Sequence, residues 1–464
     1  MRVSSSISIG LAAAASVQMV DCRLRAHKEM PSMGFSSFTP AGERGAELVA
    51  ALRAKNTTTV FYVEKGRMMC DSLDEATGAD ELKVTLTSKD AVIADKSSFV
   101  SWDKHAFTNR LSRNVWTGKV RSESGYEGYP RTISVTWIGC DIESFQVKMV
   151  SLAKNGGENV IVSRPSRDGT GGFFILSFRR KPRDERESAN RRRLLAHDEV
   201  DAKDRELEIS SGRVIDRSPV VDLLVVYTAK AKSADLKLTS SQMETEIIAA
   251  YQEANDGLAA SGVRFTVRVV HMEQVAYEEG DGRLSSVDAL YDLKSNDSFG
   301  TDIDAMRDRY GADLVQLIGL FDDVCGIGFR MGNPAAASDG NAFSVVSADC
   351  LSNLSHIHEI GHNLGADHDR DNALSLTNYG YGYRKCDGDK PFRTIMSYET
   401  GCSAAPRVNV FSTPHKTFDG RPQGTDEANN VRVLNDAMET VVNFRESRSP
   451  YETLTPPPQQ HPRL

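Results

Sequence analysis

The sequence has no run of about 18 or more apolar residues beyond its N-terminus, which is the length that a membrane-crossing helix requires. We therefore expect no membrane span. The chain also lacks an excess of positive charge, because its 56 lysines and arginines are outnumbered by 64 aspartates and glutamates. The formal net charge of −8 argues against a nucleic-acid partner, since surfaces that bind phosphates are basic.

Cysteine is scarce as well, with seven residues among 464. The N-terminus nevertheless has features of an exported protein. Arg2 provides a basic start, a weakly apolar stretch follows, and the small residues Ala13–Ala15 fit a signal-peptidase site. Residues 1–20 are therefore expected to be a signal peptide, and the protein is expected to be secreted, where disulfides can form.

The most informative stretch runs from His358 to His368 and reads HEIGHNLGADH. His358 and His362 are four residues apart, so on a helix they lie on one face, one turn apart. Gly365 can adopt the positive φ that ends this helix, and the chain then delivers His368 as a third ligand. Three neutral imidazoles around one Zn²⁺ ion leave a fourth position for water, as in catalytic zinc sites. Glu359 can take a proton from that water as the general base.

These residues follow the pattern H-E-x-x-H-x-x-G-x-x-H, and the chain resembles the metzincin zinc endopeptidases. In that clan a methionine turn lies beneath the metal, and Met396 has a suitable distance from the motif. Asp369, directly after the third histidine, resembles the reprolysin (adamalysin) branch. Tyr398 resembles the astacin and serralysin branches, in which such a tyrosine can approach the zinc and the reacting oxyanion. The combination suggests a reprolysin-like protease of the bacterial type.

An α/β (α+β) catalytic domain is expected at residues 220–448. Its alternating strand and helix patterns predict a mixed, mostly parallel sheet with helices on its faces. By resemblance, residues 342–347 are the antiparallel edge strand that holds an extended substrate. The predicted strands are 221–228, 263–270 and 314–320, and the predicted helices are 243–260, 301–310, a zinc helix at 352–364 and a closing helix at 427–444.

Residues 21–178 contain alternating apolar and polar segments such as Thr132–Trp137, and we expect a mostly β domain there. By resemblance this domain is a propeptide that keeps the enzyme latent. Many relatives use a cysteine as a temporary zinc ligand for this purpose. Cys70 and Cys140 are the candidates, and the alternative is that they form a disulfide or stay buried as thiols.

Residues 179–219 are expected to form a charged linker. Its triple arginine, Arg191–Arg193, predicts cleavage by a processing protease that prefers basic sites. Residues 449–464 contain a triple proline and are expected to be a disordered tail.

Four cysteines lie around the zinc motif and the methionine turn. We expect the two sequential pairings, because they would fasten both walls of the site, although four cysteines permit three arrangements. The expected disulfides are Cys325–Cys350 and Cys386–Cys402.

The resemblance implies a secreted zinc metalloendopeptidase, made as a latent zymogen, that hydrolyses internal bonds of protein or peptide substrates. Two alternatives remain open: a zinc-binding interaction module with little turnover, and a permanent binding role for the N-terminal β domain. The intact Glu359 favours the enzyme. Calcium is conceivable near Asp367, Asp369 and Asp371, but the sequence has no EF-hand spacing. Cleavage specificity cannot be predicted from these residues.

Overall fold

The computed structural model describes residues 219–448, apart from 234–237, 280–284, 296, 332–337, 374–377, 389 and 403–404, together with the strands of an N-terminal sheet. The expectations for the signal peptide, for Cys70 and Cys140, for linker residues 181–218 and for the tail at 449–464 lie outside these residues. Within the described residues, no helix combines the length and the hydrophobicity that a membrane span needs.

A five-stranded sheet forms the centre of the C-terminal region, with the strand order β12-β11-β13-β15-β14. The first four strands are parallel, as the alternating strand and helix pattern predicts. β11, β13 and β15 are buried along almost their whole length, because helices cover both faces of the sheet. The bounds are β11 (Val220–Tyr227), β12 (Thr266–Gln274), β13 (Leu314–Gly319), β14 (Gly326–Gly328) and β15 (Phe343–Ser347).

The antiparallel edge strand is not where the resemblance placed it. Residues 343–347 form β15, which is parallel to β13 and lies inside the sheet. The antiparallel edge is the short strand β14, which pairs with β15 on one side only. The burial of every β15 side chain explains this position, since an interior strand is covered on both faces. β14 has the sequence Gly-Ile-Gly, which carries no alternating pattern that would predict a strand.

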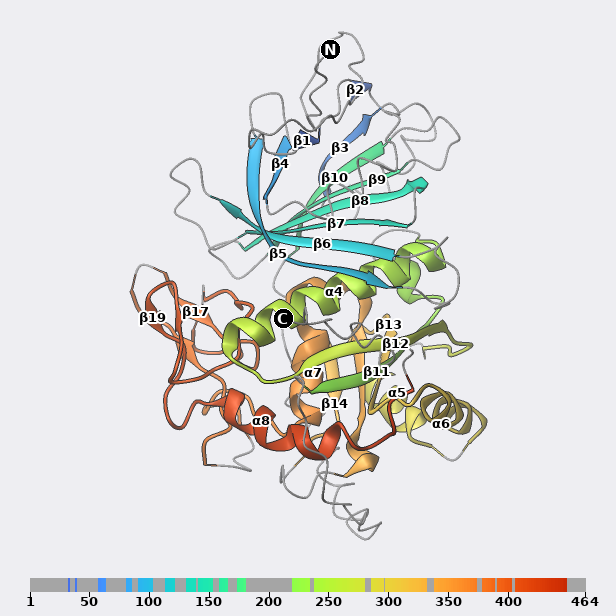
Figure 1. Cartoon of the computed structure of the whole chain (residues 1–464), viewed down its shortest axis with the longest axis vertical. Helices are drawn as coiled ribbons and strands as arrows, with labels where there is room; N and C mark the ends of the chain where they lie inside the picture. The colour runs from blue at the N-terminus through green and yellow to red at the C-terminus, as the bar shows by residue number, and fades with distance from the viewer. Residues whose placement is uncertain are drawn as a thin grey trace, which may run out of the picture.

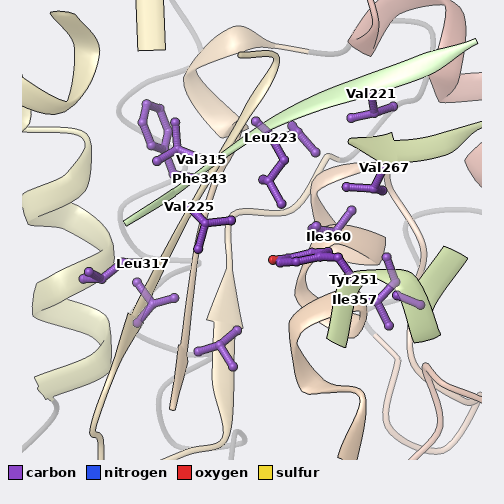
Figure 2. Close-up of a cluster of buried hydrophobic side chains, with 14 of the residues drawn as sticks. Val221, Leu223, Val225, Tyr251, Val267, Val315, Leu317, Phe343, Ile357 and Ile360 are labelled. Atoms are coloured by element: carbon purple, nitrogen blue, oxygen red, sulfur yellow. The ribbon is translucent and has the colours of Figure 1, made fainter. Parts of the chain in front are cut away.

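Helices α4 and α7 pack against each other, and their apolar side chains meet those of the sheet (Figure 2). Tyr251 of α4 lies beside Ile357 and Ile360 of α7, and the sheet residues Val225 and Val267 complete this part of the core. α5 was not predicted from the sequence. The bounds are α4 (Ser240–Ser261), α5 (Ser285–Leu293), α6 (Ser298–Tyr310), α7 (Ser355–Asn363) and α8 (Asn430–Val441).

The two ends of α4 are well defined. The Thr239 hydroxyl accepts a bond from the Gln242 backbone N–H at 3.1 Å, and the Gln242 side chain accepts one from the Thr239 N–H at 3.0 Å. This reciprocal pair is a capping box. Gly262 ends the helix with a φ of 86°, which glycine adopts without strain.

The zinc helix begins later than predicted. Residues 348–353 form a short 3-10 helix, η4 (Ala348–Asn353), and α7 starts at Ser355. Leu354 separates the two with a φ of 68°, a left-handed conformation that is rare for a residue with a branched side chain. The Leu354 side chain is nevertheless 5% exposed, because it packs into the core.

The N-terminal sheet has ten strands in the order β1-β4-β5-β6-β7-β8-β9-β10-β3-β2, and all neighbours except β1 and β4 are antiparallel. Its central strands lie along α4 (Figure 1). The strands are β1 (Ser32–Met33), β2 (Phe38–Thr39), β3 (Thr57–Val63), β4 (Glu81–Thr85), β5 (Ala91–Trp102), β6 (Arg113–Arg121), β7 (Arg131–Ile138), β8 (Asp141–Leu152), β9 (Glu158–Pro165) and β10 (Phe173–Arg180).

Candidate metal centre

Three imidazole nitrogens meet at one point beside α7. The Nε2 atom of His368 lies 3.1 Å from Nε2 of His358 and 2.9 Å from Nε2 of His362. Two of these side chains come from one face of α7, and the third comes from the loop that follows it. Among the described residues, these three form the one cluster of histidine, cysteine and acidic side chains close enough to hold a metal ion together.

The opposite ring nitrogens fix the protonation of two of the histidines. His358 Nδ1 lies 2.9 Å from the Ile395 carbonyl, and His362 Nδ1 lies 2.9 Å from the Ala366 carbonyl. A carbonyl only accepts hydrogen bonds, so each Nδ1 donates and each Nε2 presents a lone pair to the centre. Burial, followed by the charge of His362, holds the pKa of His358 well below its usual value, which favours this neutral form.

This arrangement fits a zinc ion. Three buried lone pairs about 3 Å apart repel one another unless a cation lies between them. Tetrahedral coordination with Zn–N bonds of about 2.0–2.1 Å separates neighbouring nitrogens by roughly 3.3 Å, close to the separation seen here. The carbonyl bonds to Nδ1 are also the outer contacts that orient zinc-binding histidines in proteins.

The Glu359 carboxyl lies against the edge strand β14. Its side chain is 2% exposed, and a Cβ atom built on Gly326 would lie only 2.6 Å from Glu359 Oε1. A Cβ on Gly328 would lie 3.0 Å from the Glu359 carbonyl oxygen. Both glycines of β14 therefore leave room for Glu359 and for its turn of the helix.

The loop that carries His368 is tied to the segment after β14. Gly365 turns the chain with a φ of 86°, and the Asp367 carboxylate accepts a bond from the His368 N–H at 2.7 Å. The same carboxylate forms a buried ion pair with Arg330. The Met331 N–H donates to the His362 carbonyl at 3.2 Å. Arg330 and Met331 thus support two of the three histidines: Met331 contacts the backbone of His362, and Arg330 holds the Asp367 side chain that binds the His368 backbone.

Met396 and Tyr398 lie next to the histidines, on the turn between β17 (Phe392–Arg393) and residue 402. Met396 is fully buried, and a Cβ on Gly361 would lie 2.6 Å from its sulfur, so Met396 packs beneath the turn of α7 between His358 and His362. The Tyr398 ring centre lies 4.2 Å from that of His368.

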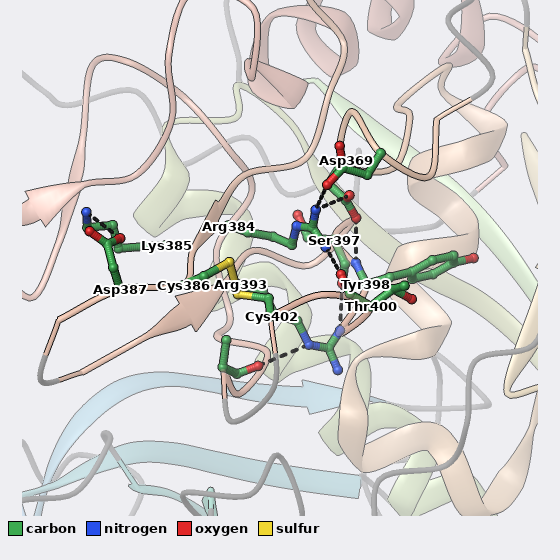
Figure 3. The surroundings of a disulfide bond; sticks show 12 residues. Asp369, Arg384, Lys385, Cys386, Asp387, Arg393, Ser397, Tyr398, Thr400 and Cys402 are labelled. Atoms are coloured by element: carbon green, nitrogen blue, oxygen red, sulfur yellow. Dashed lines mark hydrogen bonds and ion pairs between the residues drawn. A yellow bond between two sulfur atoms is a disulfide. The ribbon is translucent and has the colours of Figure 1, made fainter.

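Asp369 connects the third-ligand loop to this turn (Figure 3). Its carboxylate accepts a bond from the Tyr398 N–H at 2.9 Å and forms an ion pair with Arg384 at 3.0 Å. Arg384 also pairs with Asp371. The three aspartates considered for calcium therefore each pair with an arginine, Asp367 with Arg330 and the other two with Arg384; these contacts do not test the calcium prediction.

Two disulfides flank the centre. Cys325, directly before β14, pairs with Cys350 in η4, and Cys386 pairs with Cys402 beyond the methionine turn (Figure 3). The first joins the edge strand to the segment that leads into α7. The second closes the loop that contains β17.

Some supporting residues were not anticipated from the sequence. Gly326 and Arg330 were missed, because the only sequence signal was a pair of glycines in an otherwise apolar run. His356 lies outside the histidine cluster, and its Nε2 faces the Ala250 carbonyl at 3.0 Å. Burial lowers the pKa of His356 to about 4, so it stays neutral.

Residues 217–412 match the model of metallo-peptidase family M12 of the reprolysin type. The match covers the central sheet, α7 and the methionine turn. This region is similar to reprolysin-like M12 metallopeptidase domains. M12 metallopeptidases use zinc, in agreement with the histidine cluster.

Curated relatives of the M12 domain are bacterial. The chain is 31% identical over 244 residues to a peptidyl-Asp metalloendopeptidase of Xanthomonas campestris pv. campestris. That alignment covers 51% of this chain and 55% of the relative. It is 32% identical over 232 residues to a peptidyl-Asp metalloendopeptidase of Stenotrophomonas maltophilia. That alignment covers 48% of this chain and 52% of the relative. The chain therefore spans about half the length of the curated relatives it matches.

A solved structure described as a chaperone–substrate complex matches 49% of this chain and 36% of that one, with 22% identity and a TM-score of 0.38. A score this low supports no conclusion about the fold.

Proposed function

We propose that this protein is a zinc metalloendopeptidase in which His358, His362 and His368 hold the metal. The convergence of their three Nε2 atoms beside a buried glutamate carries the proposal. The M12 match and the names of the curated relatives support it. Bound zinc would act as a Lewis acid toward a peptide carbonyl and increase the acidity of a water molecule.

Glu359 is the proposed general base. Its carboxylate takes a proton from the attacking water and delivers it to the departing amine. The glycines of β14 keep space for this carboxylate next to α7. Tyr398 is proposed to donate a hydrogen bond to the oxyanion, since its ring lies beside the rings of His358 and His368.

The edge strand β14 is the proposed docking strand for the substrate. It pairs with β15 on one side and is last in the sheet order, so an extended peptide can add to its other side. This assignment replaces residues 343–347, which lie inside the sheet.

We further propose a preference for acidic residues next to the cleaved bond. The curated relatives are named peptidyl-Asp metalloendopeptidases. In this chain the positive charges of Arg407 and Arg393 act on His358. We propose that these charges contribute to a positive potential near the histidines that favours a substrate carboxylate. Peptides that differ only by aspartate or asparagine at one position test the preference, and equal cleavage of both would contradict it.

Secretion, a β-rich propeptide at 21–178 and processing within 179–219 remain proposals. The two disulfides fit an oxidising compartment. The resemblance to latent metzincins supports the order of propeptide, linker and catalytic domain at 220–448.

The decisive experiment compares wild type, Glu359→Gln and chelator-treated wild type on a denatured protein mixture, with new peptide ends read by mass spectrometry. We expect new internal ends with untreated wild type alone. Glu359→Gln is expected to reduce the rate by about 10²–10⁴-fold while the zinc content stays the same. If wild type and Glu359→Gln were equally inert after cleavage of the linker, a zinc-binding module without turnover would replace the protease.

A further inference from the structure

Helix α4 is buried on more than one side. Every residue from Met243 to Tyr251 is buried, which covers more than two full turns. A helix on the surface of a domain normally buries one apolar face and exposes the other. Here the central sheet and α7 cover one side of α4, and the N-terminal sheet covers the opposite side (Figure 1).

The side of α4 that faces the N-terminal sheet carries carboxylates. Glu244 forms an ion pair with Arg113 of β6. Glu246 pairs with Lys148 of β8 at 3.0 Å and accepts a bond from Gln146 at 2.5 Å. The two glutamate side chains are 6% and 9% exposed. Carboxylates buried to this extent are tolerated because the N-terminal sheet supplies the cations.

The contact continues along the second half of the helix. Glu253 accepts a bond from the Thr132 hydroxyl at 3.0 Å, and Asp256 accepts one from the Thr117 hydroxyl at 2.8 Å. Val115 of β6 belongs to the same hydrophobic cluster as the catalytic core. The surface of α4 is therefore complementary to the sheet in charge and in hydrogen bonding.

The opposite side of α4 supports the zinc helix. The Ala250 carbonyl faces His356 Nε2 at 3.0 Å, and the Tyr251 ring packs edge-on against the His356 ring at 5.1 Å. His356 precedes the first zinc-site histidine by two residues. α4 thus lies between the N-terminal sheet and the start of α7.

We propose that the four carboxylates of α4, Glu244, Glu246, Glu253 and Asp256, form a docking surface for the N-terminal sheet. On this surface the sheet stays bound to the catalytic domain after the linker is cut. Its docking holds α4 in place behind the zinc helix. This inference rests on the proposed cleavage of the linker, but it does not depend on catalysis.

The test uses the full chain as Glu359→Gln, which prevents self-digestion, with a recognition sequence for a site-specific protease inserted in residues 181–218. The chain is folded, cut once and analysed by gel filtration and native mass spectrometry. At about 0.1 M salt we expect both pieces to elute as one complex. At about 1 M salt the dissociation constant of the cut complex is expected to rise, because salt screens the attraction between the separated charged surfaces, while the buried pairs themselves are screened little. Separation at low salt would overturn the proposal.

Two substitutions test whether the named contacts hold the complex. Lys148→Met and Glu246→Gln are each expected to raise the dissociation constant of the cut complex by at least about ten-fold. Glu439→Gln is the matched control, because this glutamate is exposed on α8. Unchanged affinity in both substituted chains would refute the charged docking surface. The salt titration of the otherwise unsubstituted Glu359→Gln chain decides the question if a variant fails to fold.

A second readout tests the link to α7. Zinc release to a chromogenic chelator is measured from the cut complex and from the catalytic piece after the sheet is removed. We expect at least about three-fold faster release without the sheet, because α4 then loses one of its two supports. Equal rates would refute the link. These results stand whether or not the wild-type chain proves to cleave peptides.

Discussion

Helices α4 and α7 pack against each other, but their buried polar side chains have different roles. α4 is 22 residues long, begins with a capping box, and its buried carboxylates meet cations from the N-terminal sheet. α7 has nine residues and no side-chain cap, and its His358 and His362 side chains, together with His368 from the following loop, face a point where a cation would bind. The groups on α4 are satisfied by another part of the chain, and those on α7 are arranged for a ligand. This contrast separates a supporting helix from a functional one.

The largest expected effect concerns α4, the supporting helix of the two. Arg113→Met removes the guanidinium paired with Glu244 inside the interface. Breaking one partner of a buried pair costs about 3–5 kcal/mol, so the free energy of unfolding of the full chain should fall by about that amount. Urea denaturation measures the change. The double variant Arg113→Met/Glu244→Leu should regain much of the loss, and a double variant as unstable as the sum of both single changes would refute a coupled pair.

The next prediction concerns the histidine cluster at α7, the functional helix of the two. Arg330→Met removes the ion pair that holds Asp367, whose other oxygen binds the His368 backbone. Loss of such an outer contact should weaken zinc binding about 10–100-fold. Competition with a chelator of known affinity measures it. Arg370→Met is the control, because that side chain is 63% exposed and its ion pair lies on the surface. Equal zinc affinity in both variants would contradict the role of Arg330.

A smaller effect is expected from Gly326→Ala. The added methyl group would contact Glu359 Oε1, which lies at the movable end of its side chain. The carboxylate should shift, and kcat should fall about ten-fold, with little change in thermal stability or zinc content. Gly340→Ala is the control, since a Cβ there meets its nearest neighbour at an ordinary 3.5 Å. An unchanged kcat would show that Glu359 tolerates the displacement.

The smallest effect comes from the cap of α4. Thr239→Ala removes the hydroxyl that accepts the Gln242 N–H. The free energy of unfolding should fall by about 1 kcal/mol, while zinc affinity and the peptidase rate per zinc stay the same. Thermal denaturation and zinc titration on the same samples check both parts. A loss of zinc affinity larger than the loss of stability would mean that α4 is not merely a support.

The sequence was sufficient to predict the features that depend on local spacing. The spacing of His358, His362 and His368 in the sequence predicted that their side chains lie close together. The apolar runs predicted the parallel strands. The M12 match confirms the family that the motif indicated. Boundaries were less accurate, because the left-handed Leu354 divides the predicted zinc helix into η4 and α7.

Features that depend on distant contacts could not be predicted. The Gly-Ile-Gly strand has no pattern of its own and is defined by its pairing with β15. The Arg330–Asp367 pair joins residues with no local relation. The acidic residues of α4 look like the exposed face of an amphipathic helix, and only the fold shows the N-terminal sheet covering them. Sequence periodicity records that a face is polar, but not what lies against it.

Leu354 has a consequence for protein engineering. A leucine in the left-handed region costs about 1–2 kcal/mol, and replacement by glycine would release that cost. The same replacement would remove a side chain buried in the core and free the joint between η4 and α7 to pivot. In a library screened only for a higher melting temperature, relief of backbone strain would favour glycine at this position, while loss of the buried side chain would disfavour it. Selection for zinc retention alone should keep the leucine, since the bulky residue fixes the direction in which the zinc helix starts.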